Sequence, residues 1–154
     1  RYGNGLVEEY RTDDADVVLV TMGTNVSTAR TVVDQMRKEG KSVGLVKVRS
    51  FRPFPTKELR DIAKKASVMG VLDRSASFGF GSPLYTDVRS AVYGAKNQPT
   101  IMGFIAGLGG RDITASTINY CYDVMLKNAK TGKIPSSFVK PGELYYDHID
   151  VRKE

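Results

Sequence analysis

Cysteine and histidine, the side chains most often used for nucleophilic and metal chemistry, each occur once in this sequence. Cys121 alone cannot form a disulfide within the chain or supply the thiolates of a metal cluster. His148 alone excludes His-rich metal sites and argues against a Ser-His-Asp hydrolase. Cys121 falls on an apolar helical stripe, so we expect it to be a small core residue. The sequence therefore assigns no catalytic residue and no metal ligand.

Two glycine-rich segments have the composition to bind an anion through backbone N–H groups. They span residues 73–81 and 107–112, and each precedes an expected helix. Neither is a nucleotide-binding fingerprint, because Asp112 occupies the place of the third glycine of G-x-G-x-x-G. The alternative is that the glycines only permit tight turns between strand and helix. The weak candidates for cofactor binding are Gly107, Gly109, Gly110 and Arg111.

Four arginines follow expected strands and could bind a carboxylate or a phosphate through their guanidinium groups. They could equally form ion pairs within the chain, since Asp73 and Asp112 are close in sequence. These arginines are Arg49, Arg52, Arg74 and Arg111.

Two phenylalanines lie beside two of these arginines in a proline-rigid loop over residues 49–55. Aromatic rings next to arginines are typical of protein interfaces. The alternative is that both rings pack into the core of their own domain. The predicted interface residues are Arg49, Phe51, Arg52, Phe54, Arg74 and Phe78.

The charge of the chain does not indicate a nucleic-acid-binding protein. Lys and Arg number 23 against 17 Asp and Glu, a formal net charge of +6, but the two signs are interspersed. The chain contains no basic block of five, no zinc finger and no RNP-like aromatic motif. No apolar run approaches the ~20 residues of a membrane-spanning helix. A surface with a modest positive patch is the simpler interpretation, with no nucleic-acid or membrane partner.

Apolar residues follow strand and helix spacing in turn along the chain. Helical stripes follow β-branched runs, which predicts a parallel sheet with helices on both faces. Thr56, Ser82 before Pro83, and Asp112 or Thr114 are the expected helix N-caps, and Gly40 ends the first helix. The predicted strands span residues 17–21, 42–48, 68–72 and 101–106.

The chain has 154 residues. We expect residues 12–130 to form a doubly wound α/β domain. Residues 1–11 resemble a linker from an upstream domain of a longer polypeptide. Residues 131–154 lose helical periodicity and form an extended tail with spaced aromatics. In such an open sheet, ligands bind beyond the carboxyl ends of the strands. The glycine-rich segments and the arginines all follow strands, so we expect them at that edge.

Four sequence motifs together resemble one family from about Gly5 to Asn128. They are similar to the alpha subunit of pyruvate:ferredoxin oxidoreductase and its 2-oxoacid relatives, and within it to the second domain, which resembles the C-terminal domain of transketolase-type thiamine enzymes. The motifs are Val48-Arg-Ser-Phe-Arg-Pro-Phe-Pro55, Leu72-Asp-Arg74, Phe78-Gly-Phe-Gly81 and Gly107-Leu-Gly-Gly-Arg-Asp112.

The resemblance implies a cytoplasmic enzyme with thiamine diphosphate, Mg²⁺ and iron-sulfur clusters, which converts a 2-oxoacid and CoA to acyl-CoA and CO₂ and reduces ferredoxin. This chain lacks the Gly-Asp-Gly metal loop and the four thiolates that a cluster needs. The expectation is therefore a non-catalytic assembly domain that binds no cofactor alone. Its partners would be an upstream pyrimidine-binding domain and the other subunits. The alternative is a stand-alone module that binds CoA at its glycine-rich strand ends.

Overall fold

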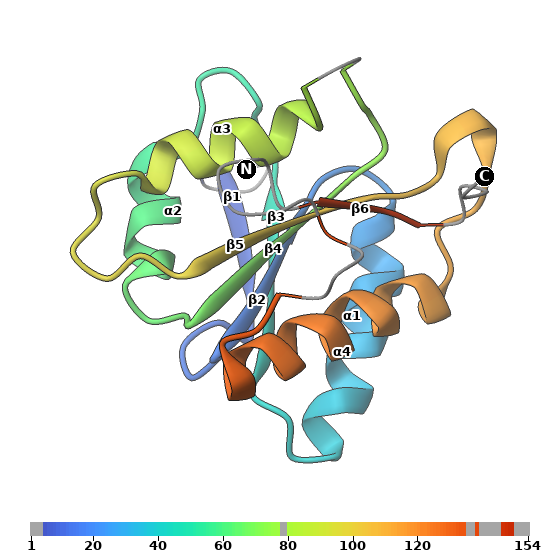
Figure 1. The fold of residues 1–154 in the computed structure, drawn as a ribbon, viewed down its shortest axis with the longest axis horizontal. Helices are drawn as coiled ribbons and strands as arrows, with labels where there is room; N and C mark the ends of the chain where they lie inside the picture. Colours follow the sequence, from blue (N-terminus) through green and yellow to red (C-terminus); the bar gives the residue numbers. More distant parts are fainter. Residues whose placement is uncertain (1–4, 78–79, 135–137, 139–145, 150–154) are drawn as a thin grey trace.

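A six-stranded sheet lies at the centre of the described part of the chain (Figure 1). The computed structural model describes residues 5–77, 80–134, 138 and 146–149. The strand order is β1-β3-β2-β4-β5-β6; all neighbouring strands are parallel except β1 and β3, which are antiparallel. The strands are β1 (Val7–Tyr10), β2 (Val17–Thr21), β3 (Val43–Val48), β4 (Val68–Asp73), β5 (Thr100–Ile105) and β6 (Tyr146–His148).

Helices cover both faces of the sheet, which confirms the predicted doubly wound α/β architecture. Helices α1 (Asn25–Lys38) and α4 (Ala115–Thr131) lie together on one face, and α2 (Thr56–Ala63) and α3 (Pro83–Val92) on the other (Figure 1). In β2, Val17 and Leu19 belong to the core under α1 and α4, whereas Val18 and Val20 belong to the core under α2 and α3. Side chains alternate across a strand, so a strand that is apolar at every position supplies both cores.

Helix ends follow the expected capping chemistry at three of four positions. The Ser82 hydroxyl accepts a hydrogen bond from the backbone N–H of Tyr85 at 3.2 Å, and Thr114 accepts one from Thr117 at 3.3 Å. Gly40 follows α1 with φ +78°, the left-handed conformation that suits glycine after a helix. Thr56 is a correction: it is the first residue of α2, and Pro55 occupies the cap position without a side-chain hydrogen bond.

Strands β1 and β6 were not expected from the sequence. The sequence predicts a linker over residues 1–11, yet β1 pairs with β3 along its whole length. The sequence predicts an extended tail over residues 131–154, yet β6 pairs with Gly103–Ile105 of β5. In the same tail, Phe138 is buried and packs edge-on against Phe104, with ring centroids 5.5 Å apart. Part of the expected tail thus completes the sheet and its core.

A buried hydrogen bond joins α4 to the middle of the sheet. The Tyr122 hydroxyl donates to the backbone carbonyl of Gly44 at 2.8 Å. Burial raises the pKa of Tyr122 well above 10.0, so the hydroxyl keeps its proton at any physiological pH. A Cβ on Gly44 would lie 2.7 Å from the carbonyl oxygen of Arg11, so only glycine allows this close approach. Within the described ranges, no helix is long and apolar enough to cross a bilayer.

Candidate interface at the carboxyl edge of the sheet

The loops that follow β2, β3, β4 and β5 meet at one edge of the sheet, as predicted, because these strands run parallel. The chain passes from β2 to β3 on one side and from β4 to β5 on the other, so the switch point lies between β2 and β4. There the Thr21 hydroxyl donates to the carbonyl of Leu72 at 2.9 Å in a buried hydrogen bond. This bond holds the two strand ends together under the loops.

The N-terminus of α3 is occupied by a carboxylate of the chain itself. Asp73 accepts hydrogen bonds from the Ser82 hydroxyl at 2.7 Å and from the backbone N–H groups of Ser75 at 3.2 Å and Leu84 at 3.1 Å. The carboxylate thus takes the place that an external phosphate would use at a helix N-terminus. The segment 73–81 therefore acts as an internal cap within its described residues, rather than as an open anion cradle.

Gly107 has a structural reason to be glycine. It has φ +76°, and a Cβ there would lie 3.0 Å from Nε of Arg74 and 3.1 Å from Ile113. Arg74 crosses this glycine and donates to the backbone carbonyl of Arg111 at 3.2 Å. A side chain at position 107 would displace Arg74.

The next two glycines, Gly109 and Gly110, also have positive φ but face open space. With the exposed Arg111, they are the part of the predicted cofactor site that remains accessible. Of the four candidates, these three could approach a ligand.

Two of the four arginines form ion pairs within the chain. Arg49 pairs with Glu8 of β1, and Arg52 pairs with Asp87 of α3 at 2.7 Å. Neither partner is evident from the sequence, because Glu8 and Asp87 are 41 and 35 residues away from their arginines. The Arg52 side chain is still 64% exposed, so its pair is a surface salt bridge and contributes at most about 1 kcal/mol.

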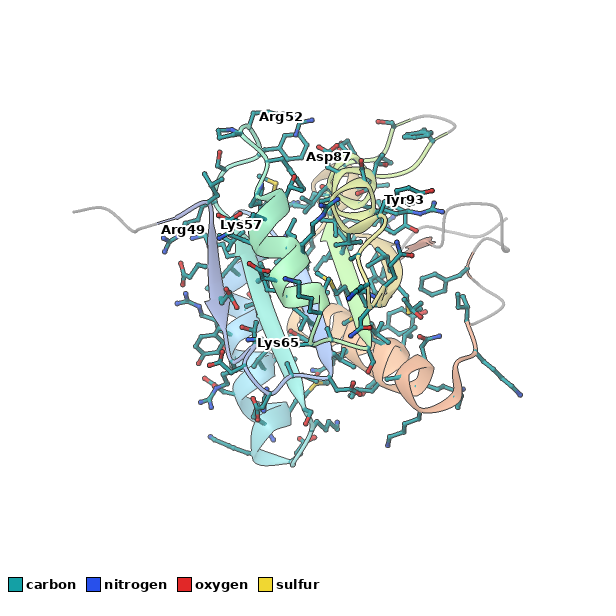
Figure 2. All side chains as sticks on the ribbon, turned by 90° about the vertical axis from the view of Figure 1, so that its left-hand side faces the viewer. Arg49, Arg52, Lys57, Lys65, Asp87 and Tyr93 are labelled. Atoms are coloured by element: carbon teal, nitrogen blue, oxygen red, sulfur yellow. The ribbon has the colours of Figure 1, made fainter. Side chains whose placement is uncertain are left out.

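Arg52 lies at the surface (Figure 2) and forms a cluster with Phe51 and Phe54, here called the Arg52 cluster. The two rings meet edge to face with centroids 5.9 Å apart, and the Arg52 guanidinium lies 4.3 Å from the Phe51 ring centroid. Both rings are half-buried against the core under α2 and α3. The structure therefore lies between the two alternatives: the rings touch their own core and still present a face to solvent.

Of the predicted interface residues, Phe78 lies outside the described residues. The remaining five lie at the carboxyl edge, and Asp87 joins them from α3. No group of three or more His, Cys, Asp or Glu side chains that could hold a metal ion occurs in the described ranges. Cys121 is buried in the core under α1 and α4, as expected.

Comparisons with known proteins agree on one family. The family model described as pyruvate:ferredoxin oxidoreductase core domain II matches residues 15–118. The chain is 38% identical to the pyruvate synthase subunit PorA of Pyrococcus furiosus over 83% of its length and 32% of that relative. It is 47% identical to PorA of Methanothermobacter thermautotrophicus over 74% of its length and 29% of that relative. It is also 42% identical to the ketoisovalerate oxidoreductase subunit VorA of Pyrococcus furiosus, over 87% of its length and 34% of that relative.

A solved structure has a similar fold. It is the 2-oxoglutarate:ferredoxin oxidoreductase of Magnetococcus marinus, solved with 2-oxoglutarate, coenzyme A and succinyl-CoA bound, and it matches with a TM-score of 0.59 at 18% identity. The match covers 79% of this chain and 20% of that one. The chain spans about a third of the curated relatives it matches. The residues matched by the family model include the parallel strands β2 to β5 and all four loops of the carboxyl edge. The chain therefore belongs to the pyruvate:ferredoxin oxidoreductase core domain II family.

Proposed function

We propose that this chain is the transketolase C-terminal-like assembly domain in the alpha subunit of a 2-oxoacid:ferredoxin oxidoreductase. The enzyme would depend on thiamine diphosphate, act in the cytoplasm and convert a 2-oxoacid, with pyruvate as the leading substrate, and CoA to acyl-CoA and CO₂. Two electrons would pass through iron-sulfur clusters to ferredoxin. The observation that carries the proposal is the family match over residues 15–118 in a chain whose one cysteine is buried.

The domain would act through contacts rather than chemistry. At the carboxyl edge, Asp73, Arg49 and Arg52 are engaged by partners within the chain. The relatives include subunits of both a pyruvate enzyme and a ketoisovalerate enzyme at similar identity. This is the pattern expected if the substrate pocket lies outside the domain. The upstream pyrimidine-binding domain, Mg²⁺ and the clusters would belong to the rest of the complex.

The isolated chain should not reduce an artificial electron acceptor with pyruvate, CoA and thiamine diphosphate. It contains one cysteine, whereas one cluster needs about four thiolates. The measurement is methyl viologen reduction under anaerobic conditions. The control is the same chain assembled with its partner polypeptides, which should be active. Turnover by the isolated chain after rigorous purification would contradict the proposal.

Substitutions in the Arg52 cluster should weaken assembly without unfolding the domain. Arg52→Ala and Phe51→Ala remove exposed parts of an aromatic-arginine surface, and interface anchors of this type contribute more than about 1 kcal/mol each. We expect the dissociation constant for the partner polypeptides to rise about tenfold, which corresponds to about 1.4 kcal/mol. The melting temperature of the isolated Arg52→Ala domain should change little, because the Arg52 pair with Asp87 is largely solvated, whereas Phe51→Ala should lower it moderately because the ring is half-buried.

Lys57→Ala is the matched control for these two variants, since Lys57 is exposed on the same face but outside the cluster (Figure 2). Normal assembly of both Arg52→Ala and Phe51→Ala would remove this cluster from the interface. A separate calorimetric titration with CoA tests the alternative of a stand-alone module. Saturable binding at Gly109, Gly110 and Arg111 that is lost in Arg111→Ala would favour that alternative.

A further inference from the structure

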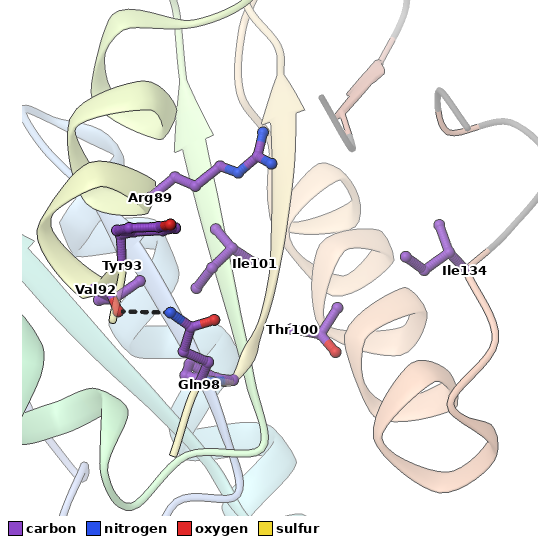
Figure 3. A pocket seen from close by; sticks show the side chains of 8 residues that line it. Arg89, Val92, Tyr93, Gln98, Thr100, Ile101 and Ile134 are labelled. Carbon is purple, nitrogen blue, oxygen red and sulfur yellow. Dashed lines mark hydrogen bonds between the residues drawn. The ribbon is translucent and has the colours of Figure 1, made fainter. Parts of the chain in front are cut away.

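A hollow lies beside the first residues of β5, away from the carboxyl edge of the sheet (Figure 3). It has a volume of about 390 Å³. Its wall is formed by the last turn of α3 and its floor by the start of β5, and Ile134, which follows α4, completes the lining. The apolar part of the lining is made by Val92, Ile101 and Ile134. The proposed assembly role, as argued above, does not use this hollow.

The exposed ring of Tyr93 stands at this hollow on a firmly held backbone. Arg60 of α2 donates to the carbonyl oxygens of Ala91 at 2.6 Å and of Tyr93 at 3.3 Å. Gln98 donates to the carbonyl of Val92 at 3.4 Å. Three carbonyls at the end of α3 are thus satisfied by side chains from α2 and from the loop before β5. The Tyr93 ring itself is 79% exposed.

The Tyr93 side chain presents a large aromatic ring to solvent on an ordered backbone, which favours association with a partner. It loses little conformational entropy on association, because its backbone is already ordered. Tyrosine and arginine are also the residue types that dominate binding energy when they surround an apolar pocket. The tyrosine at this hollow is therefore better suited to contact a partner than to stabilise the fold.

Arg89 gives the hollow its charge. It is the charged residue among the eight that line the hollow, it is exposed, and its guanidinium extends over the hollow from α3 toward β5 (Figure 3). Among the described residues, no acidic side chain lines the hollow and Arg89 forms no ion pair. A carboxylate that entered beside Ile101 would meet an uncompensated guanidinium, which binds carboxylates in a two-pronged geometry.

We propose that this hollow docks a segment of a partner subunit in which an apolar side chain stands next to a carboxylate. The apolar side chain packs between the Tyr93 ring and Ile101, and the carboxylate pairs with Arg89. This inference rests on the proposed assembly function and adds a second contact surface to it. The two surfaces use different residues of α3: the Arg52 cluster is linked to Asp87 in the middle of the helix, whereas the hollow is lined by Arg89 and Val92 of its last turn and by Tyr93.

The test compares Arg89→Glu and Tyr93→Ala with Lys96→Glu in the assembled complex. Lys96 is exposed in the loop before β5 but does not line the hollow, so it controls for charge reversal. Both test variants should raise the dissociation constant for the partner polypeptides at least about tenfold, whereas Lys96→Glu should change it less than about twofold. All three isolated domains should keep the wild-type melting temperature within a few degrees. An unchanged dissociation constant in Arg89→Glu overturns the proposal.

The Arg52→Ala and Phe51→Ala variants, measured in the same assay, separate this proposal from the proposed function. If they weaken assembly and Arg89→Glu does not, the assembly function stands and the second surface is wrong. If no variant at either surface weakens assembly, both proposed contact surfaces are wrong.

A photo-cross-linking residue in place of Tyr93 identifies the occupant. In the purified complex, we expect a cross-link to a partner-subunit peptide that carries Asp or Glu within two residues of an apolar side chain. A cross-link to a second copy of this chain, or to a peptide without a carboxylate, overturns the assignment. Titration of the isolated chain with 3-phenylpropionate tests a free small acid. Saturable binding that requires Arg89, without any cross-link to a partner, assigns the hollow to small carboxylates instead.

Discussion

Replacement of Tyr122 by alanine should lower the free energy of unfolding by about 3–5 kcal/mol, the cost of removing a large aromatic ring from a packed core. The Tyr122 side chain is completely buried under α1 and α4, and its hydroxyl donates to Gly44 at 2.8 Å. Truncation therefore leaves both a cavity and a buried carbonyl without its donor. Chemical denaturation of the isolated domain, followed by circular dichroism, measures the difference.

Two further variants separate packing from hydrogen bonding at this position. Tyr122→Phe keeps the ring and should cost about 1–3 kcal/mol, because the carbonyl of Gly44 stays buried and loses its partner. Tyr93→Ala is the matched control: this ring is 79% exposed, and the variant should be within about 0.5 kcal/mol of wild type. Equal stabilities of Tyr122→Phe and the wild-type domain would show that the hydrogen bond contributes nothing.

Replacement of Phe138 by alanine should cost about 3–5 kcal/mol, although Phe138 lies in the segment that the sequence assigned to a tail. Its ring is 4% exposed and packs edge-on against Phe104, which is itself fully buried. Edge-to-face aromatic pairs add to the effect of burial. Thermal and urea unfolding of the variant measure the loss, with Phe80→Ala as control, since the Phe80 side chain is 56% exposed.

Truncation after residue 132 extends this test to the whole segment. The shortened domain should still unfold cooperatively, because β1 to β5 and all four α-helices remain. It should be less stable than the full chain by at least the effect of Phe138→Ala, since β6 and its pairing with β5 are also removed. A truncated domain as stable as the full chain would show that residues beyond 132 do not contribute to the stability of the domain.

The central sheet, the two helical layers and the family all follow from patterns that can be recognised in the amino-acid sequence alone. Strands β2, β3, β4 and β5 are covered on both faces, so their residues must be apolar at successive positions, and this pattern is visible without any tertiary information. Helix ends at Ser82, Thr114 and Gly40 were also predictable, because capping depends on residues within a few positions of one another. The glycine-rich and arginine-rich loops were predictable at one edge of the sheet, because each follows a strand of the predicted parallel sheet.

The edge strands and the partners of the candidate functional side chains depend instead on the three-dimensional fold. β1 and β6 lie at the sheet edges, where one side is open and no continuous apolar pattern is required, so they do not stand out in sequence. The pairs Arg52–Asp87, Arg49–Glu8 and Tyr122–Gly44 join residues 35, 41 and 78 positions apart. Such contacts depend on the path of the chain through the folded domain, which side-chain spacing does not encode. For that reason the sequence indicated Phe51, Arg52 and Phe54 as partner-binding candidates but not Tyr93. The fold shows that Asp73 caps α3 internally, that the rings of Phe51 and Phe54 are half-buried, and that Tyr93 is exposed.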